Sequence, residues 1–332
     1  MKRKIIKQGH NTLTVTLPSD WAKSLNIKAG DEIDVVEKEN TLVINGNHTQ
    51  TCKKAVIDIR DFSIPMLWRY FQSAYRAGCD EIKIIYDPKS RKYEDAYHYY
   101  TTQFDYAKFG EKTIQKPVVV MIREVMNRFV GMEIVETGED YCVVKEMGDI
   151  TTKEFDNTLR RIFLIVMQLF ERIGEAVDKN QVNDPGLCKE IHSIDLTIDK
   201  FVDYCSRILN KIDLNIPSHR KPLIFSSLFM LEMVGDEFKY IGKHMALAKK
   251  PVKEVLPLFK KVREHFEQYY HLYYTFSREK AIEFGNKDIE VYQFHSGLKE
   301  NMRGESKSMM KHMMTISKFT LALVELRIEM EF

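Results

Sequence analysis

The sequence predicts a multidomain α+β protein with a β-rich N-terminal domain, a small α+β middle domain and an all-α C-terminal domain. Three observations predict this. Short β-rich segments separated by turn residues fill positions 1–48, and strand and helix patterns alternate over 50–150. Helical spacing of apolar residues then continues over 152–332. At about 150 residues per domain, a chain of 332 residues has room for such a division.

The N-terminal segment reads as two short strands, a short helix and a closing hairpin. Residues 4–7 and 13–17 are rich in β-formers and bounded by Gly9 and other turn residues. A short helix is expected over 20–25, with Ser19 as its N-cap. Alternating apolar residues on both sides of a turn predict a hairpin over 33–44.

The middle segment, 50–150, alternates strands with helices. A helix is expected over 65–77 and is closed by Gly78, the residue type that most easily adopts the left-handed conformation. This alternation, followed by a hairpin, predicts a small α+β sandwich. The other expected elements are strands at 54–59, 81–86 and 118–122, a helix within 93–107, a short helix over 123–129, and a hairpin over 133–145.

The C-terminal segment is expected to contain six helices joined by short connections, which favours antiparallel bundles. Apolar residues within 190–209 recur on one helical stripe, for example. The six helices fall into two sets of three, over about 152–249 and 252–332, which suggests an internal repeat. The expected ranges are 152–180, 185–211, 217–248, 252–277, 278–300 and 303–332.

Composition narrows the classes of function. Lys and Arg total 50 and Asp and Glu total 48, so any DNA contact must come from a local basic patch. The five cysteines form no CxxC pair, and no apolar run approaches the ~20 residues of a membrane span. We therefore expect a cytoplasmic protein that is not embedded in a membrane. No nucleotide-binding or catalytic motif is present, and we expect no enzyme.

The first domain resembles the AbrB/MazE/SpoVT family. The resemblance lies in residues 8–18, which end in Leu-Pro, in Trp21-Ala22, and in 25–33 with its Gly-Asp turn. It implies a swapped-hairpin β-barrel built from two chains, hence a homodimer through this domain, with a basic DNA-binding surface. A domain that only dimerises is the alternative, because acidic residues follow the basic ones. The residues expected to contact DNA are Lys2, Arg3, Lys4, Lys7, His10, Asn11 and Thr12.

Acidic residues spaced by four mark two of the expected helices. Asp195, Asp199 and Asp203 share one helical face, and Glu232 and Asp236 share another. If these helices pack antiparallel, Asp195, Asp199, Glu232 and Asp236 form a four-carboxylate cluster suited to a divalent metal, with Asp203 as a weaker candidate. His244, two turns beyond Asp236, could reach the same face. A solvated acidic face is the alternative reading.

The helical segment resembles PhoU, the regulator of phosphate uptake, through 187–203 and 231–241. PhoU contains two three-helix bundles with paired acidic motifs, and Glu290, Glu325 and Glu329 stand as weaker equivalents in the second unit. Together with the first domain, this is similar to an archaeal class of phosphate-uptake regulators. The resemblance implies iron or another divalent metal, and a phosphate ABC transporter ATPase as a partner.

These observations leave three functions open. The first is a DNA-binding regulator of phosphate uptake, with a dimeric head and a sensing helical body. The second is an adaptor of the PhoU type that docks on a phosphate ABC transporter without binding DNA. The third is a metal-binding helical protein, for which no accompanying nucleophile or base is evident.

Overall fold

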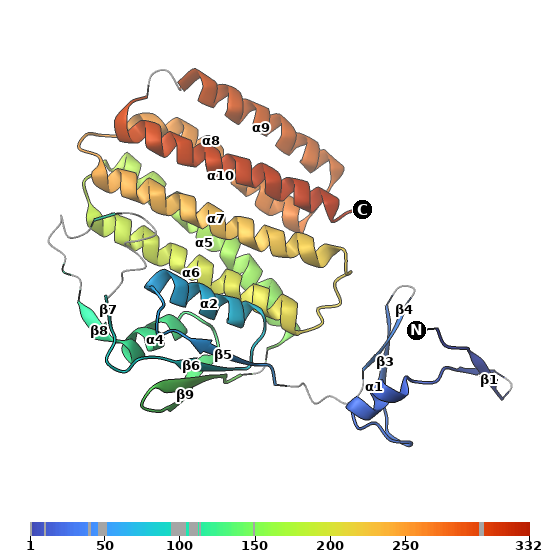
Figure 1. Ribbon diagram of the computed structural model, residues 1–332. Coiled ribbons are helices and arrows are strands. Elements are labelled where there is room, and N and C mark those ends of the chain that lie inside the picture. Colours follow the sequence, from blue (N-terminus) through green and yellow to red (C-terminus); the bar gives the residue numbers. More distant parts are fainter. Residues whose placement is uncertain are drawn as a thin grey trace. The chain divides into compact units, whose positions relative to one another are not determined.

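The computed structural model confirms a multidomain α+β chain with a small N-terminal strand region and a C-terminal helical region (Figure 1). The chain divides into two compact units, Met1–Cys52 and Lys53–Phe332, which are described separately. None of the described helices is long and apolar enough to span a bilayer. The structure describes residues 2–9, 11–38, 41–45, 52–93, 104–105, 112, 114–148, 150–298 and 302–332.

The N-terminal unit contains two antiparallel strand pairs and one short helix. Strand β1 (Ile6–Gln8) pairs with β2 (Thr12–Thr14), and β3 (Asp34–Lys38) pairs with β4 (Thr41–Asn45). Helix α1 spans Ser19–Ser24. Ser19 was expected to cap this helix, but Pro18 holds the N-cap position and makes no side-chain cap, so Ser19 is the first helical residue.

The second unit begins with a four-stranded sheet in the order β5-β6-β10-β9. β5 and β6 are parallel, because helix α2 connects them, and the other pairs are antiparallel. Apolar side chains of α2 and α4 pack on one face of this sheet to form its core. The bounds are β5 Lys54–Asp58, α2 Ile64–Arg76, β6 Glu81–Ile85, α4 Val118–Met126, β9 Met132–Thr137 and β10 Tyr141–Glu146. A separate antiparallel pair joins β7 (Arg91–Tyr93) to β8 (Gln115–Pro117).

The strand expected over 118–122 is wrong, because these residues form the first half of α4. The buried residues of α4 are Val118, Met121, Ile122, Val125 and Met126, a spacing that places them on one helical face. Most of the helix expected within 93–107 lies outside the described residues.

All six expected C-terminal helices are present, with bounds close to those predicted. Their apolar faces share one continuous core. α7 packs against both α6 and α10, and α2 of the sheet layer packs against α6 (Figure 1). The bounds are α5 Thr152–Asp178, α6 Pro185–Lys211, α7 Arg220–Leu247, α8 Leu256–Tyr274, α9 Arg278–Leu298 and α10 Gly304–Glu329, with a 3₁₀ turn at Lys253–Val255 before α8.

Candidate functional site

The residues expected to contact DNA lie around the β1–β2 turn of the N-terminal unit. Gly9, in this turn, has φ of +75°, which glycine adopts without strain. The basic residues precede β1 or lie within it, and Thr12 begins β2. His10 lies outside the described residues. The others are all exposed: Lys2, Arg3, Lys4, Lys7, Asn11 and Thr12.

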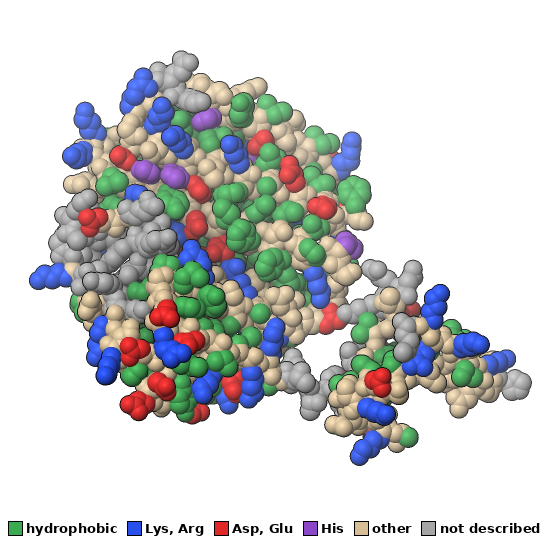
Figure 2. All heavy atoms as spheres, in the orientation of Figure 1, with side chains coloured by type: hydrophobic (Ala, Val, Ile, Leu, Met, Phe, Trp, Pro, Cys, Tyr) green, Lys and Arg blue, Asp and Glu red, His purple; other side chains and the backbone are tan. Residues whose placement is uncertain are grey.

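The N-terminal unit exposes much of its apolar surface. Among its residues whose side chains are described, none is buried. Leu13 on β2 is 68% exposed and Leu42 on β4 is 66% exposed. Hydrophobic and basic side chains are both exposed on the visible face of this unit, alongside acidic ones (Figure 2). A strand pair that leaves its apolar side chains in water gains little hydrophobic stabilisation, so these strands need a covering surface.

The acidic residues of α6 are buried against α7. Asp195 and Asp203 are fully buried, and Asp199 is nearly so. Gly235 on α7 makes this close approach possible, since a Cβ added there would lie 2.5 Å from Asp195 Oδ1. The two helices therefore bring Asp195 and Asp199 of α6 next to Asp236 of α7, whereas Glu232 shares the guanidinium of Arg76 with Asp203.

Two cations that the sequence reasoning did not place lie within this acidic cluster. Lys239 Nζ lies 2.9 Å from Asp195 Oδ2 and also pairs with Asp236, one turn before it on α7. Arg76, the last residue of α2, donates to Asp203 and, over 2.8 Å, to Glu232 Oε2. The five carboxylates thus receive two positive charges from these side chains.

Burial disfavours the ionised form of these acids. It raises the pKa of Asp195 to about 7, although Lys239 acts in the opposite direction. Burial likewise raises the pKa of Asp203 to about 7, against the opposing effect of Arg76. The pKa of Asp199 is raised well above its ordinary value by burial and by the neighbouring Asp195. Burial alone would lower the pKa of Lys239, but Asp195 and Asp199 raise it, so the ammonium stays charged.

The cluster has the donor set of a cation site but already contains an ammonium group. One oxygen from each of Asp195, Asp199 and Asp236 lies within 4.8 Å of the others. Asp199 Oδ1 accepts no hydrogen bond from the described residues. Carboxylate oxygens suit hard divalent ions, yet Lys239 Nζ lies against two of these three carboxylates. A metal could bind here only if Lys239 moved away.

The weaker metal-ligand candidates in the second predicted three-helix bundle, residues 252–332, are not part of this cluster. Glu325 and Glu329 are exposed on α10. Glu290 on α9 is also exposed, and its carboxylate lies 3.6 Å from Lys287 Nζ. His244 was expected to reach the face of Asp236, but its Nδ1 pairs instead with Glu305 Oε2 at 2.6 Å. Glu305 belongs to α10, so the side chain of His244 contacts that helix.

A second set of buried charges joins α6 to the sheet layer. Arg207 is fully buried and donates to the backbone oxygens of Tyr75 (2.8 Å) and Cys79 (3.0 Å), at the C-terminal end of α2. It also pairs with Glu146 of β10. Lys211, one turn further on, pairs with Glu146 and with Asp80. Arg207 and Lys211 thus join α6 to the end of α2 and to β10 through hydrogen bonds and ion pairs.

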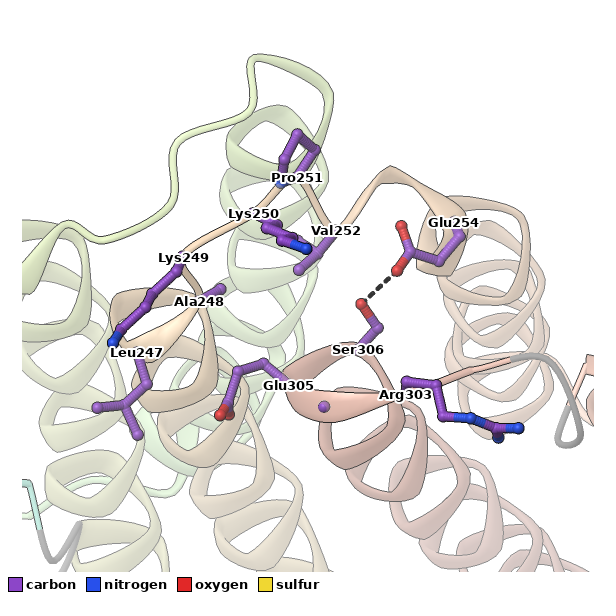
Figure 3. Close-up of a pocket in the computed structure, with 11 residues that line it drawn as sticks. Leu247, Ala248, Lys249, Lys250, Pro251, Val252, Glu254, Arg303, Glu305 and Ser306 are labelled. Carbon is purple, nitrogen blue, oxygen red and sulfur yellow. Dashed lines mark hydrogen bonds between the residues drawn. The ribbon is translucent and has the colours of Figure 1, made fainter.

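A pocket of about 490 Å³ lies where α7 ends and α10 begins (Figure 3). Its lining is mixed in charge. Lys249, Lys250 and Arg303 contribute cations, whereas Glu254 and Glu305 contribute carboxylates. Ser306 Oγ donates to Glu254 Oε1 over 2.5 Å, so this carboxylate is already engaged (Figure 3). The pocket therefore has no single charge preference.

A match to a known protein family concerns the N-terminal unit. Residues 6–45 match the family model of MazE, described as antidote-toxin recognition, bacterial antitoxin. The match covers the two strand pairs and α1 and a small part of the whole chain. Comparison with curated proteins and with solved structures gave no match.

Proposed function

We propose that this chain is a dimeric DNA-binding regulator of phosphate uptake. Its helical C-terminal domain would sense phosphate status or bind a partner protein. The exposed apolar strands of the N-terminal unit are the observation that carries the proposal. Leu13 and Leu42 would be covered by the same strands of a second copy. Pairing of two copies would also double the basic group formed by Lys2, Arg3, Lys4 and Lys7. The match to the MazE family supports a head of this type.

Dimerisation through the head is tested by placing a charge on its exposed apolar surface. We expect Leu13→Asp to convert the dimer to a monomer in analytical ultracentrifugation, because an aspartate there would be buried without a partner. Thr16→Asp, also at an exposed position of the unit, is the matched control and should remain dimeric. A Leu13→Asp protein that is still dimeric would refute pairing through this surface.

DNA binding is tested by charge reversal. We expect Arg3→Glu with Lys4→Glu to abolish the gel shift of genomic DNA fragments, since phosphate contacts supply most of the affinity. Lys23→Glu with Lys28→Glu carries the same change in charge at exposed positions outside the proposed contact set. If both double variants retard DNA equally in the gel, the alternative is favoured. In that alternative the N-terminal domain only dimerises, and the chain acts as an adaptor.

Phosphate uptake is the process we propose for regulation, with a phosphate ABC transporter ATPase as a candidate partner. The support is the resemblance of the helical segment to PhoU, given by the acidic pairs at Asp195, Asp199, Glu232 and Asp236. A genome-wide map of bound DNA at high and low phosphate tests it. Sites near phosphate-transport genes whose occupancy changes with phosphate are expected, and an identical map under both conditions would exclude this effector.

A further inference from the structure

Helices α7 and α10 carry the same short sequence pattern. Residues 237–245 read Glu-Phe-Lys-Tyr-Ile-Gly-Lys-His-Met, and residues 305–313 read Glu-Ser-Lys-Ser-Met-Met-Lys-His-Met. Glu, two Lys, His and Met recur at identical spacing. In each copy the Glu precedes the His by seven residues, which is about two helical turns and places both on one face.

The structure brings the two copies together. His244 Nδ1 lies 2.6 Å from Glu305 Oε2, and His312 Nδ1 lies 2.6 Å from Glu237 Oε2. Each histidine of one helix thus meets the glutamate of the other, which requires α7 and α10 to run antiparallel. The His244 and His312 rings lie 5.3 Å apart and are stacked. On the visible face of the bundle, histidine side chains adjoin one another and acidic side chains (Figure 2).

The hydrogen bonds determine which ring nitrogens are available. When Nδ1–H donates to a carboxylate, the neutral imidazole keeps its lone pair on Nε2. Neither side chain is fully buried, since 18% of His244 and 24% of His312 is exposed, and neither Nε2 atom is among the buried polar atoms of the described residues that lack a partner.

We propose that His244 and His312 form a two-histidine site for a borderline divalent transition metal such as Zn²⁺ or Cu²⁺. Imidazole nitrogen suits these ions better than Mg²⁺ or Ca²⁺. Metal-binding histidines usually donate their other ring nitrogen to a carboxylate, the role that Glu305 and Glu237 have here. Water completes the coordination. The site is separate from the acidic cluster of α6 and needs no DNA.

Zn²⁺ binding to the full chain, measured by equilibrium dialysis after removal of metals, tests the proposal. One ion per chain is expected. His244→Gln or His312→Gln should weaken binding at least about tenfold, and Glu237→Gln or Glu305→Gln about 10- to 100-fold. His219→Gln, at an exposed histidine before α7, and Asp199→Asn, in the acidic cluster, should bind as the unaltered chain does.

Absence of bound Zn²⁺, or binding that survives loss of both histidines, would overturn the proposal. Weakened binding in the His219 or Asp199 variant would do the same, since the ion would then be held elsewhere. Cu²⁺ bound to the unaltered chain supplies a readout that needs no variant. Its electron paramagnetic resonance spectrum should show coupling to two imidazole nitrogens, and a spectrum without nitrogen coupling would refute the assignment.

Discussion

The ammonium of Lys239 lies 2.9 Å from the fully buried carboxylate of Asp195. This pair joins α7 to α6 at the point where Gly235 allows the helices to approach closely. It also occupies the space between the acidic residues that the sequence marks as candidate metal ligands.

Removal of Lys239 should destabilise the fold strongly. Lys239→Met leaves buried carboxylates without their ammonium partner, and loss of one member of a buried ion pair costs about 3–5 kcal/mol. Lys307→Met is the matched control, because Lys307 occupies the equivalent position in the α10 copy of the pattern and makes no ion pair with the described residues. Urea unfolding measures both variants. Equal stability of the two would show that the buried pair does not hold the helices together.

The same variant also tests metal binding by the acidic cluster. With Lys239 absent, Asp195, Asp199 and Asp236 are left with oxygens close enough to share one cation. We expect Lys239→Met to bind Mn²⁺, measured by its paramagnetic resonance signal, more tightly than the unaltered chain. Tight Mn²⁺ binding by the unaltered chain would instead mean that the metal displaces Lys239.

The free energy of unfolding should fall as pH rises from about 4 to about 7. The pKa of Asp195 and of Asp203 is about 7 in the folded chain, against an ordinary value of 3.8. A group whose folded pKa is raised binds its proton more tightly when folded, so its stabilisation is complete below the ordinary pKa and is lost through the folded pKa. Each such group contributes a slope of about 1.4 kcal/mol per pH unit.

Asp199→Asn checks the cause of this slope. Asparagine cannot ionise, so the variant should show a shallower decline and should be more stable than the unaltered chain above pH 7. Asp178→Asn, at the exposed end of α5, is the control and should leave the pH profile unchanged. A profile that stays as steep in the Asp199 variant would show that its carboxyl does not bind a proton over this range.

Gly235 should not tolerate a side chain. The Cβ of Gly235→Ala would lie 2.5 Å from Asp195 Oδ1, so this buried carboxylate or α6 itself would have to shift, at a cost of about 1–3 kcal/mol. Gly285→Ala, in α9, is the matched control, because a Cβ there meets no atom within 4 Å. Alanine favours a helix over glycine by up to about 1 kcal/mol, so the control should be stabilised. Thermal unfolding of both variants measures the difference, and a stabilised Gly235→Ala would contradict the close packing.

Sequence patterns predicted the helices better than they predicted the basic side chains that pair with the buried acidic residues. Long amphipathic segments such as 152–180 repeat their apolar residues over several turns, so their structure is determined locally. The segment 118–122 begins with three β-branched residues, which favours a strand, and its helical spacing emerges only when Val125 and Met126 are included. A window of five residues is too short to distinguish the two structures.

The acidic cluster shows the same limit. The acidic pairs that face each other follow from their spacing on α6 and α7. Lys239 also stands in the sequence one helical turn after Asp236. Arg76 was not predictable in this role, because it precedes its partner Asp203 by 127 residues and belongs to the sheet layer. Only the packing of α2 on α6 brings the two together.

Arg207 should hold the C-terminal end of α2 in place. In Arg207→Met the backbone oxygens of Tyr75 and Cys79 lose the hydrogen bonds from Arg207 and Glu146 loses a buried partner, so we expect a loss of about 3–5 kcal/mol. Hydrogen–deuterium exchange should rise at residues 76–80 before it rises in the core of α6. Arg278→Met, at the exposed start of α9, is the control. Unchanged exchange at 76–80 in the Arg207 variant would mean that Arg207 does not hold the end of α2 in place.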